Sequence, residues 1–159
     1  MKKIFFKITY AILLWGLLGG GCEKGDKYPT LEDKQLTVVE VNSGECKQNL
    51  KSTETEKYIE LKAEQNNQLR VTLINATLNC CPGEITSKAY IKDEILRINF
   101  AEETPGKCNC ICDFDLECVI GPMEYRSYTI EVYAGSDKAF AKFTFTYCSC
   151  LDSKIKLSN

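Results

Sequence analysis

The sequence predicts an all-β protein, an antiparallel immunoglobulin-like β-sandwich of about seven or eight strands cross-linked by disulfide bonds. Apolar and polar residues alternate with period two from residue 35 to the end, which indicates half-buried strands. Gly, Pro and Asn turn signals separate the alternating runs, as is typical of sandwiches. The chain also has 10 cysteines in 159 residues, far more than a cytosolic domain usually carries.

Each predicted strand is a short run in which apolar residues share one face. In chain order, the strands are expected at 36–41, twice within a hairpin at 57–74, and at 85–91, 96–100, 108–120, 128–132 and 143–147. A helix over 53–65 is the alternative for that region, because Glu and Lys are abundant there. Turn signals are expected to separate the strands at residues 64–67, 82–83, 104–106 and 134–137.

The segment 108–120 has the most regular alternation in the chain. Its even positions carry Cys or apolar side chains, which fall on one face of an extended strand. Its odd positions place Asp113, Asp115 and Glu117 on the opposite face. Three carboxylates in a row can hold calcium or bind a sugar. We favour the simpler interpretation that they form the solvated face of an amphipathic strand.

The amino terminus has the pattern of an export signal. Three lysines at positions 2, 3 and 7 precede an apolar run of 11 residues, 8–18, and then three glycines. This run is too short to cross a hydrocarbon core of ~30 Å as a helix. A cationic start, a short apolar segment and small residues together predict a signal peptide over residues 1–21.

The glycine run leads directly into Cys22, and this arrangement resembles the lipobox of bacterial lipoproteins. The resemblance implies that Cys22 is lipidated and becomes the first residue of the mature chain. Acyl chains on Cys22 would anchor the protein in a membrane. Residues 22–34 are then the lipidated cysteine and a flexible tether, and residues 35–159 a single domain. The alternative is ordinary signal cleavage, with Cys22 in a disulfide.

Charge and composition exclude several functions. Without residues 1–21 the chain has 17 basic and 22 acidic residues, a net charge of −5, which repels nucleic acid. The chain contains no histidine, so Ser-His-Asp and Cys-His catalysis are excluded. The motifs of P-loop, dinucleotide-binding, serine-hydrolase and zinc-protease sites are also missing. We therefore expect neither an enzyme nor a cofactor.

Nine cysteines follow Cys22, and in an oxidising compartment they are expected to form disulfides. Neighbours two residues apart on a strand sit ~6.6 Å apart, whereas bonded cysteines need Cβ atoms ~3.8 Å apart. Pairing must therefore be cross-strand, with Cys80 or Cys81 as the natural partners of the Cys108–Cys112 run. Cys118 and Cys148 are candidates to pair near the other end of the sandwich. The candidates are Cys46, Cys80, Cys81, Cys108, Cys110, Cys112, Cys118, Cys148 and Cys150. Cys148 and Cys150 are also two residues apart, so the same ~6.6 Å spacing argues against a bond between them, although a chain end can bend. Because nine is odd, at least one thiol stays free or bonds another molecule.

A thiolate site is the alternative for this cysteine cluster. This cluster could bind zinc or copper(I) through its thiolates, or it could contain a redox-active pair. Its members are Cys80, Cys81, Cys108, Cys110 and Cys112. A Cys-x-x-Cys knuckle and histidine are both missing from the sequence, and export favours oxidation. Structural disulfides are therefore the preferred interpretation.

The central part of the chain resembles a group of small cysteine-rich lipoproteins of Bacteroidota. The resemblance spans roughly residues 68–132 and rests on the motifs Asn79-Cys80-Cys81-Pro82, Cys108-x-Cys-x-Cys112-Asp-Phe-Asp115, Ile120-Gly121 and Tyr128-Thr-Ile130. Cys118 departs from the pattern, which usually has tyrosine there. The resemblance implies an outer-membrane lipoprotein, facing the periplasm or the cell surface, and implies no activity.

Five tyrosines are the remaining candidates for a binding site, namely Tyr90, Tyr125, Tyr128, Tyr133 and Tyr147. They could form an aromatic platform for carbohydrate, but tyrosine is also an ordinary strand residue, and packing is the favoured interpretation. The sequence thus predicts a lipid-anchored cell-envelope module that binds or has a structural role without catalysis. Its expected partners are the membrane, through the lipid, and an envelope protein or glycan. A thiol-redox or metal-thiolate protein is the alternative.

Overall fold

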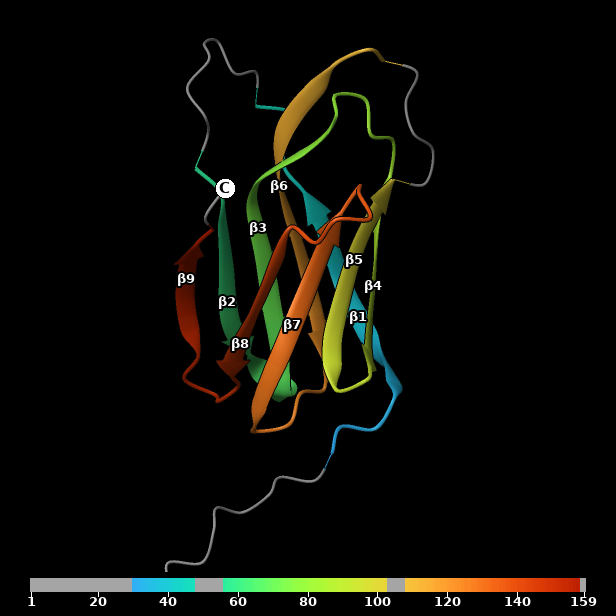
Figure 1. Cartoon of the computed structure of the whole chain (residues 1–159). Helices are drawn as coiled ribbons and strands as arrows, with labels where there is room; N and C mark the ends of the chain where they lie inside the picture. Colours follow the sequence, from blue (N-terminus) through green and yellow to red (C-terminus); the bar gives the residue numbers. More distant parts are fainter. Residues whose placement is uncertain (1–29, 48–55, 103–107, 158–159) are drawn as a thin grey trace, which may run out of the picture.

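A computed structural model describes residues 30–47, 56–102 and 108–157. The predicted signal peptide, Cys22 and the turn at 104–106 lie outside these ranges. The described residues form nine strands and one 3-10 turn, η1 (Gln65–Asn67) (Figure 1). The strands are β1 (Lys34–Ser43), β2 (Tyr58–Glu64), β3 (Gln68–Asn79), β4 (Ile85–Lys92), β5 (Ile95–Glu102), β6 (Ile111–Gly121), β7 (Ser127–Ala134), β8 (Ala141–Thr146) and β9 (Asp152–Lys156).

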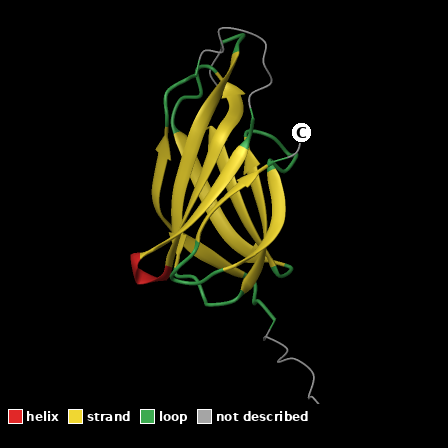
Figure 2. Cartoon of the chain, turned by 90° about the vertical axis from the view of Figure 1, so that its left-hand side faces the viewer, coloured by secondary structure: helices red, strands yellow, loops and turns green. Residues whose placement is uncertain are grey.

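The strands form one curled sheet in the order β8-β7-β5-β4-β1-β6-β3-β2-β9 (Figures 1 and 2). Strand β1 belongs to both halves, because Lys34–Leu36 pair with β4 and Thr37–Ser43 pair with β6. The register of β1 breaks between Val38 and Glu40, as in a β-bulge, which bends a strand. The bend lets one strand join two half-sheets that pack face to face.

The all-β prediction is confirmed, but the antiparallel immunoglobulin-like sandwich is not what forms. Strands β5 and β7 pair in parallel, with Ile98 opposite Val132, and the sheet is therefore mixed. Between them the chain crosses to the other half, where β6 pairs with β1 and β3, and then returns. Parallel neighbours require such a crossover, whereas antiparallel neighbours need only a tight turn.

The core lies between the two half-sheets and is filled by the inward face of each strand. The fully buried side chains include Leu61 on β2, Leu73 on β3, Ile98 on β5, Leu116 on β6 and Ile130 on β7. Each such side chain contributes roughly 1.5–3 kcal/mol by leaving water. The even positions of β6 face this core as predicted, and the buried residues from both halves form one cluster.

Two local expectations change. The helix proposed as an alternative over 53–65 is wrong in its described part, because Tyr58–Glu64 is strand β2, paired with β3. Strand β9 was not predicted, and it adds to the outer edge of β2. Among the residues that the structure describes, no helix is long and apolar enough to cross a membrane.

Candidate functional site

Three disulfides gather at one end of the sheet, where β1 and β3 end and β6 begins. They join Cys46 to Cys112, Cys80 to Cys110 and Cys81 to Cys108. Two of them connect Cys80 and Cys81 to the 108–112 run, as the sequence predicts. All three bonds link segments that are distant in sequence, and they join the chain after β1 and after β3 to the start of β6.

The chain just before β6 is bent, and the bend lets the neighbouring residues Cys80 and Cys81 bond to Cys110 and Cys108. Strand β6 begins at Ile111, not at Cys108, so the predicted strand 108–120 is too long. The side-chain amide of Asn79 donates to the carbonyl of Cys108 over 2.7 Å, and the amide of Cys80 donates to the carbonyl of Cys110 over 3.1 Å. These bonds hold the bend against the end of β3.

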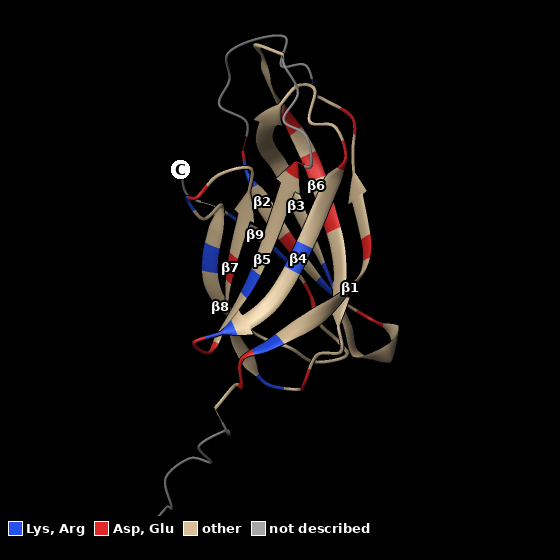
Figure 3. Ribbon diagram, turned by 90° about the vertical axis from the view of Figure 1, so that its right-hand side faces the viewer, with Lys and Arg blue, Asp and Glu red and all other residues tan. Residues whose placement is uncertain are grey.

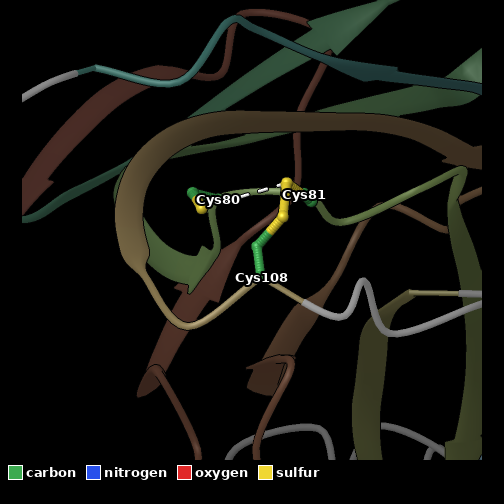
Figure 4. Close-up of side chains that lie close together, drawn as sticks. All are labelled: Cys80, Cys81 and Cys108. Carbon is green, nitrogen blue, oxygen red and sulfur yellow. Dashed lines mark hydrogen bonds between the residues drawn. A yellow bond between two sulfur atoms is a disulfide. The ribbon is translucent and has the colours of Figure 1, made fainter.

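The sulfurs of Cys80, Cys81 and Cys108 lie within 4.8 Å of one another (Figure 4). The Sγ atoms of Cys80 and Cys81 are 4.0 Å apart although each belongs to a different disulfide. A metal needs thiolate ligands, which a disulfide does not supply. A metal-thiolate site at this position therefore requires prior reduction of both bonds.

The other three cysteines of the described ranges lie elsewhere, and the expected pairing of Cys118 with Cys148 is wrong. Cys118 is on the inward face of β6 and fully buried. Burial raises the pKa of its thiol to about 12, so it stays protonated and unreactive. Cys148 follows β8, and its Sγ lies 2.6 Å from that of Cys150. An inward position on a central strand keeps Cys118 from a turn at the edge of the sheet.

The acidic row on β6 is used for bonds to neighbouring strands. Asp113 accepts from the hydroxyl of Thr77 over 2.8 Å, and it is only 5% exposed. Asp115 accepts from the ammonium of Lys47 over 2.6 Å. Glu117 is bonded by the guanidinium of Arg70. The row does lie opposite the cysteines, but its first member is buried, so the expected solvated face covers only part of it.

An open groove of about 850 Å³ lies on the outer face of β4, β5 and β7. The end of β3, the first residue of β6 and the loop after β7 border it at the end nearest the disulfides. Figure 3 views the molecule from the side of β4 and β5 and shows isolated basic residues along both strands. The polar and aromatic lining includes Asn79, Tyr90, Arg97, Asn99 and Tyr133.

A network centred on Glu131 fixes two side chains that line this groove, Arg97 and Tyr133. Glu131 on β7 accepts from Arg97 over 3.0 Å, from Tyr133 over 3.0 Å and from Lys142 over 2.7 Å. These donors, with Lys142 foremost, lower the pKa of Glu131 from its ordinary value to about 2. Glu131 therefore stays ionised, and its carboxylate holds the guanidinium of Arg97 and the phenol of Tyr133 in place.

Of the five tyrosines considered in the sequence, Tyr90 and Tyr133 line the groove. Tyr90 is opposite Arg97 across β4 and β5, and Tyr133 is opposite Asn99 across β5 and β7. From the spacings of strands and residues, the Cα atoms of Tyr90 and Tyr133 lie ~12 Å apart on one face of the sheet. Tyr128 and Tyr147 are buried, so the packing interpretation holds for them, and exposed Tyr125 packs against Tyr147.

We expect Glu131→Gln to remove a pH dependence of stability. Since folding lowers the pKa of Glu131 from 4.5 to about 2, its contribution is present above about pH 5 and is lost as pH falls toward 2. The contribution is ~2 kcal/mol after allowance for solvent screening. Urea denaturation at pH 7 and pH 3 should show a smaller loss of stability in the variant than in the unmodified protein.

Glu60→Gln is the matched control, because Glu60 also lies on an outward strand face in a single ion pair, at 2.8 Å from Lys154. Both partners there are well exposed, so the change should alter stability by at most ~0.5 kcal/mol. An equal response of the two variants would contradict the role given to the Glu131 network.

Comparison of the chain with protein-family models, curated proteins and solved structures finds no match. The function of the groove and of the cysteines is therefore inferred from their own geometry.

Proposed function

We propose that this chain is a non-catalytic binding module of the cell envelope, tethered to the outer membrane through lipid on Cys22, and that its groove binds a glycan. The observation that carries the proposal is the pair of tyrosines beside a fixed guanidinium and an amide. Aromatic rings stack on the apolar faces of sugars, while charged and amide groups hydrogen-bond their hydroxyls. The ~12 Å spacing of the two residues is longer than the step between consecutive sugars, so the two tyrosines would stack on sugar residues that are not adjacent in the glycan.

The other features agree with this role. Three disulfides support an oxidising, exported location. Glu131 is bonded by two residues of the groove, Arg97 and Tyr133, and by Lys142, and it stays ionised. It is therefore unsuited to act as a general acid, which needs a raised pKa. An anchor with a tether would let a rigid domain sample ligands near the membrane.

Binding to an array of short neutral and acidic oligosaccharides tests the proposal, with the full chain isolated in detergent from cells that export it. We expect Tyr90→Ala and Tyr133→Ala each to weaken binding by about tenfold, from loss of one stacking contact of ~1–2 kcal/mol. Tyr58→Ala is the control, because Tyr58 is half-buried on β2, outside the groove. Absence of binding, or equal losses in all three variants, would overturn the assignment of the groove.

The anchor is tested separately in the same cells. We expect the intact mass of the envelope-bound protein to show loss of residues 1–21 and gain of acyl chains. Cys22→Ser should release the domain into the soluble fraction, since attachment then lacks its lipid. Unacylated protein in the envelope fraction would count against the lipoprotein assignment.

A metal-thiolate protein is the second candidate, favoured by the close approach of the Cys80, Cys81 and Cys108 sulfurs. With Cys110 they could supply four thiolates, the number that structural zinc prefers. Purification under reducing conditions, followed by elemental analysis for zinc and copper, separates the candidates. Stoichiometric metal in protein that retains no disulfides would favour the thiolate site, whereas intact disulfides without metal support the binding module.

A further inference from the structure

The turn after β8 brings two cysteines closer together than an extended strand allows. The Sγ atoms of Cys148 and Cys150 are 2.6 Å apart. The amide of Leu151 donates to the carbonyl of Cys148 over 3.0 Å, which closes the turn. In an extended strand the same spacing would separate the residues by ~6.6 Å. The backbone has therefore already made the approach that a bond between the two sulfurs needs.

The turn is held on both sides by the body of the domain. Before it, the amide of Tyr147 donates to the carbonyl of Arg126 over 2.9 Å, and its hydroxyl donates to the carbonyl of Gln68 over 3.1 Å. After it, the amide of Ala63 donates to the carbonyl of Leu151 over 2.8 Å. The backbone on both sides of Cys148 and Cys150 is therefore anchored to neighbouring strands and loops of the domain.

The pair is accessible, unlike Cys118, the third free cysteine in the part of the chain that the structure describes. Cys150 is exposed and Cys148 is partly exposed, whereas Cys118 is buried. Reaction with a thiol or disulfide requires access for the attacking sulfur as well as a thiolate. Only the pair meets the requirement of access among the described cysteines outside the three disulfides.

A bond between these residues would do little for stability. The three disulfides link residues separated by 66, 30 and 27 positions, and long loops are the ones whose closure restricts the unfolded chain. Residues two positions apart close almost no loop, so the unfolded state loses little freedom. An exposed disulfide with little structural contribution is the kind that exchanges readily.

We propose that Cys148 and Cys150 form a reversible dithiol–disulfide site that exchanges with small external thiols and disulfides. On oxidation, one thiolate attacks an external disulfide, releases one external thiolate and is left in a mixed disulfide. The other thiolate then attacks the protein sulfur, forms the Cys148–Cys150 bond and releases the second external thiolate. The two cysteine thiols lose two protons and two electrons, and the electrons reduce the external disulfide to two thiols.

Alkylation and mass mapping of the full chain test this proposal. Protein exported by cells is equilibrated with increasing dithiothreitol, quenched with acid, alkylated and cleaved by trypsin, which leaves both cysteines in peptide 143–154. We expect this peptide to be isolated in the disulfide form, lighter by two hydrogen atoms than the dithiol. It should open at a dithiothreitol concentration at least ~10-fold lower than the three other disulfides require. A dithiol peptide in the untreated protein, or opening together with the others, would overturn the proposal.

Single variants test the exchange step itself. In Cys148→Ser, the exposed Cys150 should retain one glutathione as a mixed disulfide after incubation with oxidised glutathione, because no second thiol releases it. Fully reduced Cys148 and Cys150 in the unmodified chain should instead reach the internal disulfide and retain no adduct. Equal retention in both proteins would show that the second thiol does not resolve the mixed disulfide. This test is independent of glycan binding and of the lipid anchor.

Discussion

Replacement of Cys46 by serine together with Cys112 by alanine should lower the free energy of unfolding by ~4 kcal/mol, from the loop-closure entropy of a bond across 66 residues. This disulfide has the widest separation of the three, and the loop it closes contains strands β2 to β5. Without it the unfolded chain gains freedom, while the native contacts of β1 with β6 remain. Alanine suits position 112, because Cys112 is buried and a serine hydroxyl there would need a partner.

Urea denaturation without reductant measures this effect, and the double variant Cys148→Ser with Cys150→Ser is the control. The control removes two sulfurs that span only two positions, so its unfolding free energy should change by less than ~0.5 kcal/mol. A change of ~4 kcal/mol is a large part of the stability of an ordinary domain. A loss below ~1 kcal/mol at the Cys46–Cys112 bond would contradict the view that these disulfides stabilise by restricting the unfolded chain.

Strand positions were largely predictable, because each strand buries only one of its faces and so alternates in sequence. Strand β6 shows this most clearly, with Phe114, Leu116 and Ile120 all buried. The same rule was available for β9, where Leu151, Ser153, Ile155 and Leu157 are less exposed than their neighbours. Its apolar residues are few, and an edge strand of this kind gives a weak signal.

Strand neighbours were not predictable, because alternation tells which side chains face inward and not which strands pair. The parallel pairing of β5 with β7 and the two partners of β1 depend on contacts between distant parts of the chain. This explains why the sandwich prediction failed in topology. It also explains the error at Cys118, whose parity correctly indicated burial but carried no information on its distance from Cys148.

The groove could not be predicted for the same reason, because the sequence does not show which strands are neighbours. Tyr90 and Tyr133 were recognised as candidates, but their meeting depends on β5 lying between β4 and β7. Arg97, Asn99 and Glu131 were missed, since single polar residues on the outer face of a strand look like ordinary solvated positions. The disulfide end was more accessible to prediction, because geometry forbids most pairings of closely spaced cysteines.

Gly135→Val should destabilise the fold by ~3 kcal/mol, from left-handed backbone strain together with overpacking. Gly135 has φ of +60°, a region that β-branched residues rarely adopt. A Cβ at this position would also lie 2.6 Å from the Cδ2 atom of Leu78. Leu78 is buried at the end of β3, opposite the disulfide-bonded Cys112, so its side chain must change rotamer to admit the larger residue.

Two comparisons separate the strain from the collision. Gly83→Ala meets only the backbone cost, because Gly83 has φ of +67° but is exposed, and should lose ~1 kcal/mol. Gly135→Ala should lose ~2 kcal/mol in the unmodified chain but only ~1 kcal/mol when Leu78 is already alanine, because the colliding atom is gone. If the cost of Gly135→Ala is the same in both backgrounds, measured by urea denaturation, Leu78 does not restrict this position. The loop beside the groove would then be set by its backbone alone.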